Sequence, residues 1–345
     1  MPPPPKPALV DDLVEEILLR LPPDDPAQLL RAALVCKRWG RIVSDAGFGR
    51  RFRSFQHRSP PMLGCFCKVG GRNRFVPTSS SCPRIADHRG DRVLDARQGR
   101  VLVKLNCSRQ CDLAIWDPIT GERRNLPTLQ RFAGTYNASV LCAGGGTCDR
   151  HSCHCKQFLV VFIGTDDDYT DYTGRIFSCV YSSDTGAWSE PAFVHPPSCI
   201  DPVPGALSGN ALYYQIQMGN KILKYDLGSK AFSVIHHLPP LRYGDYCKHI
   251  APMATEDGGL GVVRVERTRL LLWSWNTGQA RWVESRTIRL RKRLPAGFCL
   301  VPDFLAIPDG TGVFLLVTAD GIFSIDLKTL KLRDMFVYFA FFYVF

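Results

Sequence analysis

Near the start of the chain, apolar residues recur at the spacing of an α-helix. Leu13, Ile17 and Leu21 lie four residues apart and Leu18 lies beside them, which places them on one stripe of an amphipathic helix. The pair Pro22-Pro23 follows directly. Because proline cannot continue a helix, this helix is predicted to end there.

Helix-end signals favour two more helical stretches. Asp12, with Glu15 three residues later, is predicted to cap the first helix. Asp24-Asp25 followed by Pro26 supplies a capping acid and a first-turn proline for the second. The apolar residues of the second helix are Leu29, Leu30, Ala33 and Leu34. Those of a third stretch, either separate or continuous with the second, are Val35, Cys36, Trp39, Ile42 and Val43.

Three short helices in about forty residues form a module at the lower size limit for independent folding, where a metal, a disulfide or a partner is usually needed. Each large aliphatic side chain that such a module buries against a partner contributes roughly 1.5 to 3 kcal/mol. The sequence therefore predicts a helical module that binds another protein.

The same residues resemble the F-box motif in their order and spacing. They are Leu9, Asp11-Asp12-Leu13-Val14, Glu16-Ile17-Leu18, Arg20-Leu21-Pro22, Leu34-Val35-Cys36-Lys37-Arg38-Trp39 and Phe48. One departure is that many F-boxes have proline after the first leucine, where this chain has Val10.

The resemblance implies that the first helix and its following loop bind a Skp-type adaptor, which links to a cullin scaffold carrying a RING subunit. The adaptor contacts carried over by position are Leu9, Leu13, Ile17, Leu18, Leu21 and Pro22. Val35, Cys36 and Trp39 either face the adaptor as well or hold the helices of the module together. The alternative is that the whole stripe is internal core, and the small size of the module argues against it.

After about Pro60, short β-rich runs alternate with Gly, Asp, Asn and Pro. A loose repeat places an apolar strand before a polar turn, as in Leu113 to Gly121. Aligned at Trp116, Tyr181, Tyr225, Trp273 and Ile325, successive units start 65, 44, 48 and 52 residues apart. The first interval contains an insertion. This spacing is typical of propeller blades.

The predicted fold class is α+β multidomain, with a three-helix F-box at 9–50 and an all-β propeller of five or six blades at 60–336. Residues 1–8 are expected to be a disordered Pro-rich lead and 337–345 an apolar tail. The β part resembles the F-box-associated region of plant F-box proteins; a pair of β-sandwiches is the alternative. Four tryptophans are expected to pack between blades, namely Trp116, Trp188, Trp273 and Trp282.

The composition is that of a globular chain, with 45% hydrophobic and 22% charged residues. The formal charge of +11 is concentrated near the N-terminus, yet no nucleic-acid-binding signature accompanies it, so nucleic acid is not the expected partner. No apolar stretch is long enough to span a membrane. The basic residues at 286–293 fit an exposed strand and turn, with a nuclear import signal as the alternative. Fourteen cysteines without a secretion signal favour reduced thiols in the cytoplasm or nucleus.

Candidate chemistry is sparse. The insertion carries Cys142, Cys148, His151, Cys153, His154 and Cys155, which are zinc-ligand types without the paired spacing of a standard finger. We therefore expect a reduced loop with no metal, and no cofactor. No phosphate-binding loop or catalytic dyad is evident.

The resemblance to F-box proteins implies a non-catalytic substrate receptor of a Skp, cullin and F-box ubiquitin ligase, whose propeller binds an unknown target protein for degradation. The candidate target-binding loops are Asp166 to Tyr169, Arg242 to Tyr246 and the Cys-rich insertion. A ligase-independent propeller scaffold or a nucleic-acid-associated protein is the alternative.

Overall fold

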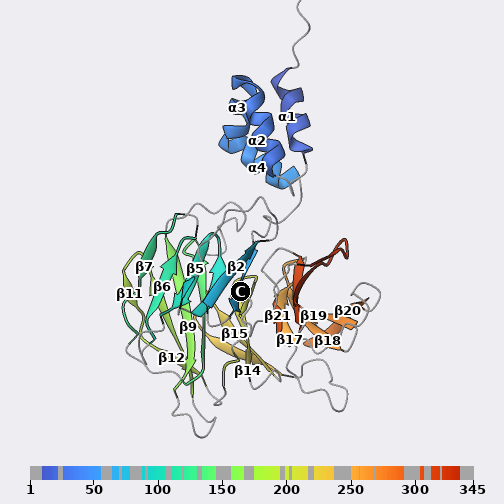
Figure 1. Cartoon of the computed structure of the whole chain (residues 1–345). Helices are drawn as coiled ribbons and strands as arrows, with labels where there is room; N and C mark the ends of the chain where they lie inside the picture. The colour runs from blue at the N-terminus through green and yellow to red at the C-terminus, as the bar shows by residue number, and fades with distance from the viewer. Residues whose placement is uncertain are drawn as a thin grey trace, which may run out of the picture.

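The computed structural model consists of a bundle of helices followed by a series of β-sheets (Figure 1). The structure describes residues 10–21, 26–55, 64–69, 72–77, 88–89, 92–105, 111–118, 120–129, 134–144, 157–166, 175–194, 199–201, 204–216, 221–236, 250–255, 257–266, 269–290, 304–306, 312–318 and 321–334. Within these residues, no helix is both long enough and apolar enough to cross a membrane.

The helical module has four helices where three were predicted. They are α1 (Asp11–Leu19), α2 (Pro26–Val35), α3 (Lys37–Ser44) and α4 (Ala46–Phe55). Pro26 opens α2, as its first-turn position predicts. Cys36 has extended backbone and separates α2 from α3, so the second and third helical stretches are not continuous. The fourth helix carries the module past residue 50.

The caps of these helices differ from the predicted ones. Val10 occupies the N-cap of α1 and no side chain caps that end, while Asp12 lies inside the helix. The prediction of a capping box at Asp12 is therefore wrong, because the chain turns into the helix two residues earlier. A side-chain cap is present at α4, where Asp45 accepts a hydrogen bond from the Phe48 backbone N–H at 2.8 Å.

The core of the module is small. Val14, Leu18 and Leu19 from α1 pack against Phe48 from α4, and all four are buried. Partly buried side chains surround them, namely Leu21, Leu29, Ala32, Trp39, Ile42, Val43 and Phe52. Among the side chains that the structure describes, four buried ones are few for a domain, which fits the predicted need for a partner.

Ion pairs on the surface tie α1 to the later helices. Arg38 of α3 pairs with Asp11 at 2.5 Å, and Arg51 of α4 pairs with Glu15. The hydrogen bond to Glu15 raises the pKa of Arg51. Because these groups are largely exposed, the pairs orient the helices more than they stabilise them.

The strands of the β region form six antiparallel sheets in the described residues. The first sheet consists of β1 (Gly64–Val69), β2 (Arg72–Pro77) and β3 (His88–Arg89). The second consists of β4 (Arg92–Arg97), β5 (Arg100–Lys104), β6 (Leu113–Trp116) and β7 (Arg123–Asn125). The third consists of β8 (Tyr136–Cys142), β9 (Phe158–Thr165) and β10 (Ile176–Ser182), with β11 (Ala187–Trp188) and β12 (Ala192–Val194) both paired with β10.

The last three sheets each have four strands paired in chain order. They are β13 (Ala206–Ser208), β14 (Ala211–Ile216), β15 (Lys221–Asp226) and β16 (Phe232–Ile235); β17 (Ile250–Ala254), β18 (Leu260–Glu266), β19 (Arg269–Asn276) and β20 (Arg281–Arg289); and β21 (Phe304–Ala306), β22 (Val313–Thr318), β23 (Gly321–Asp326) and β24 (Leu332–Asp334).

Consecutive sheets pack face to face, and each interface has its own apolar cluster. Successive residues of one strand face opposite sheets, as Val160 and Val161 of β9 show: Val160 packs toward the β4–β7 sheet and Val161 toward the β13–β16 sheet. Other clusters join the β1–β3 sheet to β4–β7, β13–β16 to β17–β20, and β17–β20 to β21–β24. The first strands also lie side by side, β4 with β8, β13 with β17, and β17 with β21. This is the arrangement of propeller blades.

The predicted number of blades was five or six. Six sheets are present in the described part of the chain, but none of the apolar clusters found there joins the first sheet to the last. The blade count of a closed ring therefore stays a prediction.

The repeat seen in the sequence corresponds to one structural unit. Every aligned position lies in the third strand of its sheet; in β6, β10, β15 and β23 it is at or next to the end of the strand, and in β19 it is three residues before the end. In four of the five turns that follow, an Asp or Asn side chain accepts a hydrogen bond from the backbone N–H three residues later. The accepting residues are Asp117, Asp226, Asn276 and Asp326. The turns also share a residue with positive φ, which is Gly121, Gly186, Lys230, Ala280 or Leu330.

The four tryptophans lie between sheets, as predicted. Trp116 contacts Phe66 of the preceding sheet, and Trp188 donates a hydrogen bond to the Pro127 carbonyl after β7 at 2.7 Å. Trp273 and Trp282 belong to the cluster that includes Ile222 of β15. These indole rings are therefore part of the packing and not of an open binding surface.

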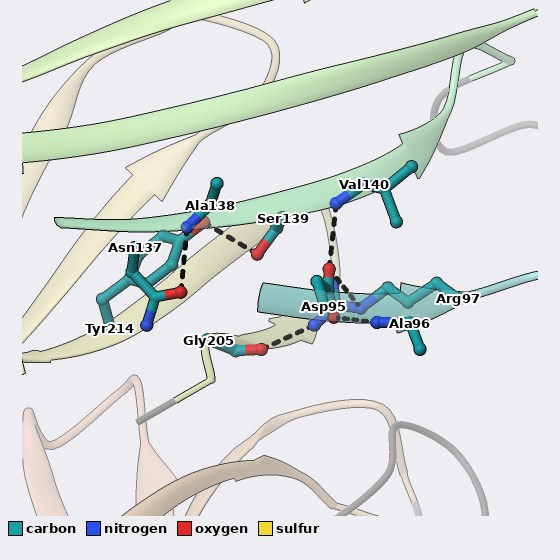
Figure 2. Close-up of polar contacts among 9 residues, drawn as sticks. All are labelled: Asp95, Ala96, Arg97, Asn137, Ala138, Ser139, Val140, Gly205 and Tyr214. Carbon is teal, nitrogen blue, oxygen red and sulfur yellow. Dashed lines mark hydrogen bonds and ion pairs between the residues drawn. The ribbon is translucent and has the colours of Figure 1, made fainter. Parts of the chain in front are cut away.

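A buried polar network joins three consecutive sheets near their first strands (Figure 2). Asp95 of β4 accepts the Val140 backbone N–H of β8 at 2.9 Å and pairs with Arg97 at 3.3 Å. Arg97 donates in turn to the Gly205 carbonyl, just before β13. On the same side of the molecule, Tyr214 donates to Ser139 at 2.9 Å.

A β-bulge aims Asp95 into this network. The pairing of β4 with β5 shifts between Val93 and Asp95, so that Asp95 lies opposite Leu102. Leu102 faces the β8–β12 sheet, and the bulge therefore directs the Asp95 carboxylate to that side. Without the extra residue the carboxylate would point to the apolar interface with the first sheet.

Candidate adaptor-docking face

Exposed large apolar side chains are concentrated on the first two helices. Eight such side chains are exposed in the described residues, and six of them lie between positions 10 and 35. We refer to these six together as the apolar face, and they are Val10, Leu13, Ile17, Leu30, Leu34 and Val35. A concentration of this kind on a short segment marks a surface for protein association.

Helix α1 divides its apolar residues between two sides. Val14 and Leu18 are 1% exposed in the module's core, whereas Leu13 and Ile17, one turn apart, are 51% and 45% exposed. Val10 continues the outer row one turn earlier. The apolar stripe predicted from the sequence is therefore wider than the core that it covers, and its outer edge is open to a partner.

Helix α2 contributes the other half of the apolar face. Leu30 and Leu34 lie one turn apart and are 65% and 85% exposed, and Val35 beside them is also exposed. Leu29 and Ala32 pack inward. Gly40 of α3 lies close to this helix, where a Cβ atom would come within 3.1 Å of the Ala33 carbonyl oxygen. The close approach fixes the orientation of α2 and thus of its outer leucines.

Eight of the nine sequence-predicted contacts fall into three groups. Leu13, Ile17, Val35 and Cys36 are exposed. Leu21 and Trp39 are partly buried against the module's core. Leu9 and Pro22 lie outside the described residues.

Leu18 does not fit the role predicted for it, because its side chain is enclosed by the module's own helices. It lies on the same stripe as Ile17, and sequence spacing alone cannot distinguish the inner from the outer side of a wide stripe. Val10, Leu30 and Leu34 are exposed but were not assigned as contacts. Their signal was present in the period of the helices, since each lies one turn from another exposed apolar residue.

The helices that carry the apolar face also carry exposed charges. Asp11 and Asp12 are exposed on α1, and Arg31, Lys37 and Arg41 are exposed on α2 and α3. Apolar and charged side chains together are the usual composition of a protein interface. Such a surface can bind an apolar groove or helix on another protein, with the charges selecting its orientation.

The described residues offer no group of three metal-ligand side chains close enough to hold an ion. Of the predicted zinc-ligand types, only Cys142 falls in this part of the chain, and it is buried at the end of β8. Cys148, His151, Cys153, His154 and Cys155 lie outside the described residues. Six cysteines of the described residues form no disulfide, namely Cys36, Cys65, Cys111, Cys142, Cys179 and Cys199. Burial raises the pKa of Cys111.

The candidate target-binding loops are described only in part. Asp166, at the end of β9, forms an ion pair with Arg175 at 3.1 Å. The rest of that loop, the loop from Arg242 to Tyr246 and the insertion at 145–156 lie outside the described residues. The insertion connects β8 to β9 within one sheet, which explains why it lengthens the first repeat interval without adding a blade.

Comparison with known families agrees with both halves of the architecture. A family model for the F-box domain matches residues 7–51, which include the apolar face. A second model, described as F-box protein AT5G49610-like, beta-propeller, matches residues 92–296, from the start of β4 to just beyond β20. The second match covers more than half of the chain. The chain belongs to this family of F-box proteins.

Two individual proteins are similar to parts of this family member. "Putative F-box protein At4g17780" from Arabidopsis thaliana is 36% identical over 74 residues, which are 21% of this chain and 18% of that relative. A crystal structure of a functionally unknown protein from Desulfotomaculum acetoxidans DSM 771 has a TM-score of 0.43 at 9% identity, over 77% of this chain and 78% of that one.

Proposed function

We propose that this F-box protein is the substrate-receptor subunit of a Skp, cullin and F-box ubiquitin ligase. The helical module binds a Skp-type adaptor through the apolar face, and the β region binds the target protein. The adaptor connects the receptor to a cullin and a RING subunit, so that the target is ubiquitinated and degraded in the cytoplasm or nucleus.

The observation that carries this proposal is the exposure of Leu13 and Ile17 on one side of α1, within the segment matched by the F-box model. Two further leucines on α2 extend the same kind of surface. Burying four such side chains at roughly 1.5 to 3 kcal/mol each supplies enough free energy to offset the entropic cost of association.

In this proposal the receptor itself performs no bond-making step. The ligase's conjugating enzyme transfers ubiquitin, and the receptor raises the effective concentration of a target lysine near that enzyme. The polar network around Asp95 holds consecutive sheets in fixed relative positions. Surfaces on different sheets can therefore contact the target without first rearranging.

Binding of the purified full chain to a purified Skp-type adaptor tests the proposal. We expect the double substitution Leu13→Asp/Ile17→Asp to weaken binding by 100-fold or more (on the order of 3 kcal/mol), because two carboxylates would be desolvated in an apolar interface. Isothermal titration calorimetry measures the affinity, and circular dichroism checks that both regions remain folded.

Val283→Asp is the matched control, because Val283 is an exposed apolar residue of β20 with 39% exposure. Its affinity for the adaptor is expected to equal that of the unsubstituted chain. If the folded chain fails to bind the adaptor, or if the α1 double variant binds it normally, the proposal is wrong.

A further inference from the structure

Strand β20 differs from the outer strands of the other four-stranded and five-stranded sheets. It has nine residues, whereas β7, β11, β16 and β24 have three, two, four and three. In the described part of the chain, its outer side pairs with no other strand. The β17–β20 sheet therefore presents a long open edge.

The strand is firmly attached although most of it is exposed. Ile288 packs into the interface with the last sheet and Trp282 into the interface with the β13–β16 sheet. The other seven side chains of β20 are exposed. Among them is Val283, one of two exposed large apolar residues outside the helical module in the described residues. The edge is thus rigid and accessible, which favours binding with little loss of entropy.

The charges along this edge are mainly positive. Arg281, Arg286 and Arg289 are exposed on β20, against the single acid Glu284, which accepts a hydrogen bond from Thr287. Arg289 lies directly opposite Arg269 of β19, and two like charges in that relation disfavour the pairing. On the inner side of β19, Glu266 of β18 lies directly opposite Arg269. Of these three neighbouring residues on β18, β19 and β20, the one at the open edge is therefore an arginine, Arg289.

We propose that the outer edge of β20 binds an extended, acidic segment of the target protein by strand addition. The inference rests on the proposed target-binding role of the β region and names where and what that region binds. Backbone groups of β20 supply the pairing, the arginines supply selection for acidic side chains, and Val283 supplies an apolar contact between them.

The same charges argue against a second copy of this chain as the occupant. Antiparallel pairing of two β20 strands would bring the arginines at one end of each strand toward those at the other end of its partner. Charged edges prevent such self-association in natural sheets. The bulge at Leu272/Trp273 leaves the extra residue Ser285 in β20, so the added segment is expected to pair in two short runs, along 281–284 and 286–289.

Fluorescence anisotropy with the full chain and labelled ten-residue peptides tests this inference. The probe is an alternating Glu-Thr peptide; the comparison peptides are an alternating Lys-Thr peptide and a Glu-Thr peptide with all its backbone nitrogens methylated. We expect the first to bind, with affinity falling as salt is raised. We expect the second not to bind, and the third to bind at least tenfold more weakly because it cannot complete a ladder of backbone hydrogen bonds.

Charge reversal locates the site. The double variant Arg281→Glu/Arg289→Glu is expected to weaken binding of the Glu-Thr peptide about tenfold or more. The control Arg123→Glu, an exposed arginine on the short outer strand β7, is expected to change it by less than about twofold. Hydrogen exchange of the unsubstituted chain provides an independent measurement, in which amides of 281–289 should exchange more slowly with peptide bound.

Several results would overturn the inference. They are equal binding of the methylated peptide, unchanged exchange at 281–289, no binding of the Glu-Thr peptide, or preferential binding of a single-stranded oligonucleotide through the same arginines. Adaptor binding measured on the same samples separates the two proposals, because a chain that binds the adaptor but not the peptide refutes only the strand-edge inference.

Discussion

The helical module and the β region use their apolar residues in opposite ways. In the β region both faces of the inner sheets are covered, and Val160 and Val161 of one strand are each at most 1% exposed. In the helical module, four side chains form the buried core while six large apolar side chains remain exposed. Stability is therefore built into the β region, whereas the module retains apolar surface for association. Five experiments test this difference between the two regions.

The largest effect is expected in the buried network of the β region. Asp95→Ala would leave the Arg97 guanidinium, whose side chain is 11% exposed, without its carboxylate, and the Val140 N–H without its acceptor. Breaking one partner of a buried pair costs about 3 to 5 kcal/mol. Urea denaturation followed by tryptophan fluorescence measures the loss. The control is Asp184→Ala in an exposed turn, and an effect of Asp95→Ala no larger than this control would contradict the role of the network.

Within the helical module, a substitution in the core should lower the free energy of unfolding, whereas a substitution on the apolar face should weaken adaptor binding. Leu18→Ala removes a fully buried side chain and is expected to cost about 2 to 5 kcal/mol. Leu34→Ala, at 85% exposure, should change the free energy of unfolding by less than about 0.5 kcal/mol while weakening adaptor binding. Thermal melts at 222 nm and titration with the adaptor give the two quantities. Equal destabilisation by both variants would show that the module has no separate outer face.

A close backbone approach tests how tightly the β region is packed. A Cβ atom at Gly205 would lie 2.5 Å from the Tyr214 ring, so Gly205→Ala should cost roughly 1 to 3 kcal/mol through overpacking. Gly278→Ala is the control, because its Cβ atom would meet nothing nearer than Asn276 Oδ1 at 3.5 Å. Denaturant midpoints compare the two, and a harmless Gly205→Ala would mean that the interface between these sheets can adjust.

The repeated turns contain a small unfavourable feature that can be removed. Ala280 has a φ of 48° where two other turns have glycine, and a left-handed conformation costs a residue with a Cβ atom about 1 to 2 kcal/mol. Ala280→Gly should therefore stabilise the β region by up to about 1 kcal/mol, the entropy of glycine offsetting part of the gain. A lower melting temperature for this variant would contradict that reading of the turn.

The smallest effect concerns pH. Hydrogen bonds from Ser229 and Gly228 lower the pKa of Asp226 in another of these turns. A carboxyl group whose folded pKa is depressed contributes stability above its unfolded pKa, and that stability is lost as the pH falls through the folded value. The difference in melting temperature between the unsubstituted chain and Asp226→Ala should therefore shrink as the pH falls below about 4. A constant difference would show that the turn is insensitive to this carboxylate.

The sequence was sufficient to predict features that depend on local pattern. The repeat aligned at Trp116 and Trp273 coincides with third strands because strand, turn and glycine or Asx residues occur together in neighbouring positions. The stripe on α1 was predicted for the same reason, since helical period is visible over two turns.

Features that depend on tertiary context could not be predicted in this way. Whether Leu18 or Ile17 faces inward is decided by where α4 places Phe48, and no local pattern contains that information. The Asp12 cap failed because the entry of the chain at Val10 sets the first helical residue. The direction of the Asp95 side chain depends on a one-residue bulge, which reverses the alternation from which a strand's faces are inferred.

The hydrogen bond from Arg97 to the Gly205 carbonyl joins residues 108 positions apart in the chain. During synthesis this acceptor reaches the guanidinium only after the ribosome has produced the complete β8–β12 sheet and the start of the next. A nascent chain released before that point retains the Arg97–Asp95 ion pair but lacks the Gly205 acceptor, and it also lacks the strands that cover Val161 and Ile163 of β9. Incomplete products of this length should consequently expose apolar surface and tend to aggregate.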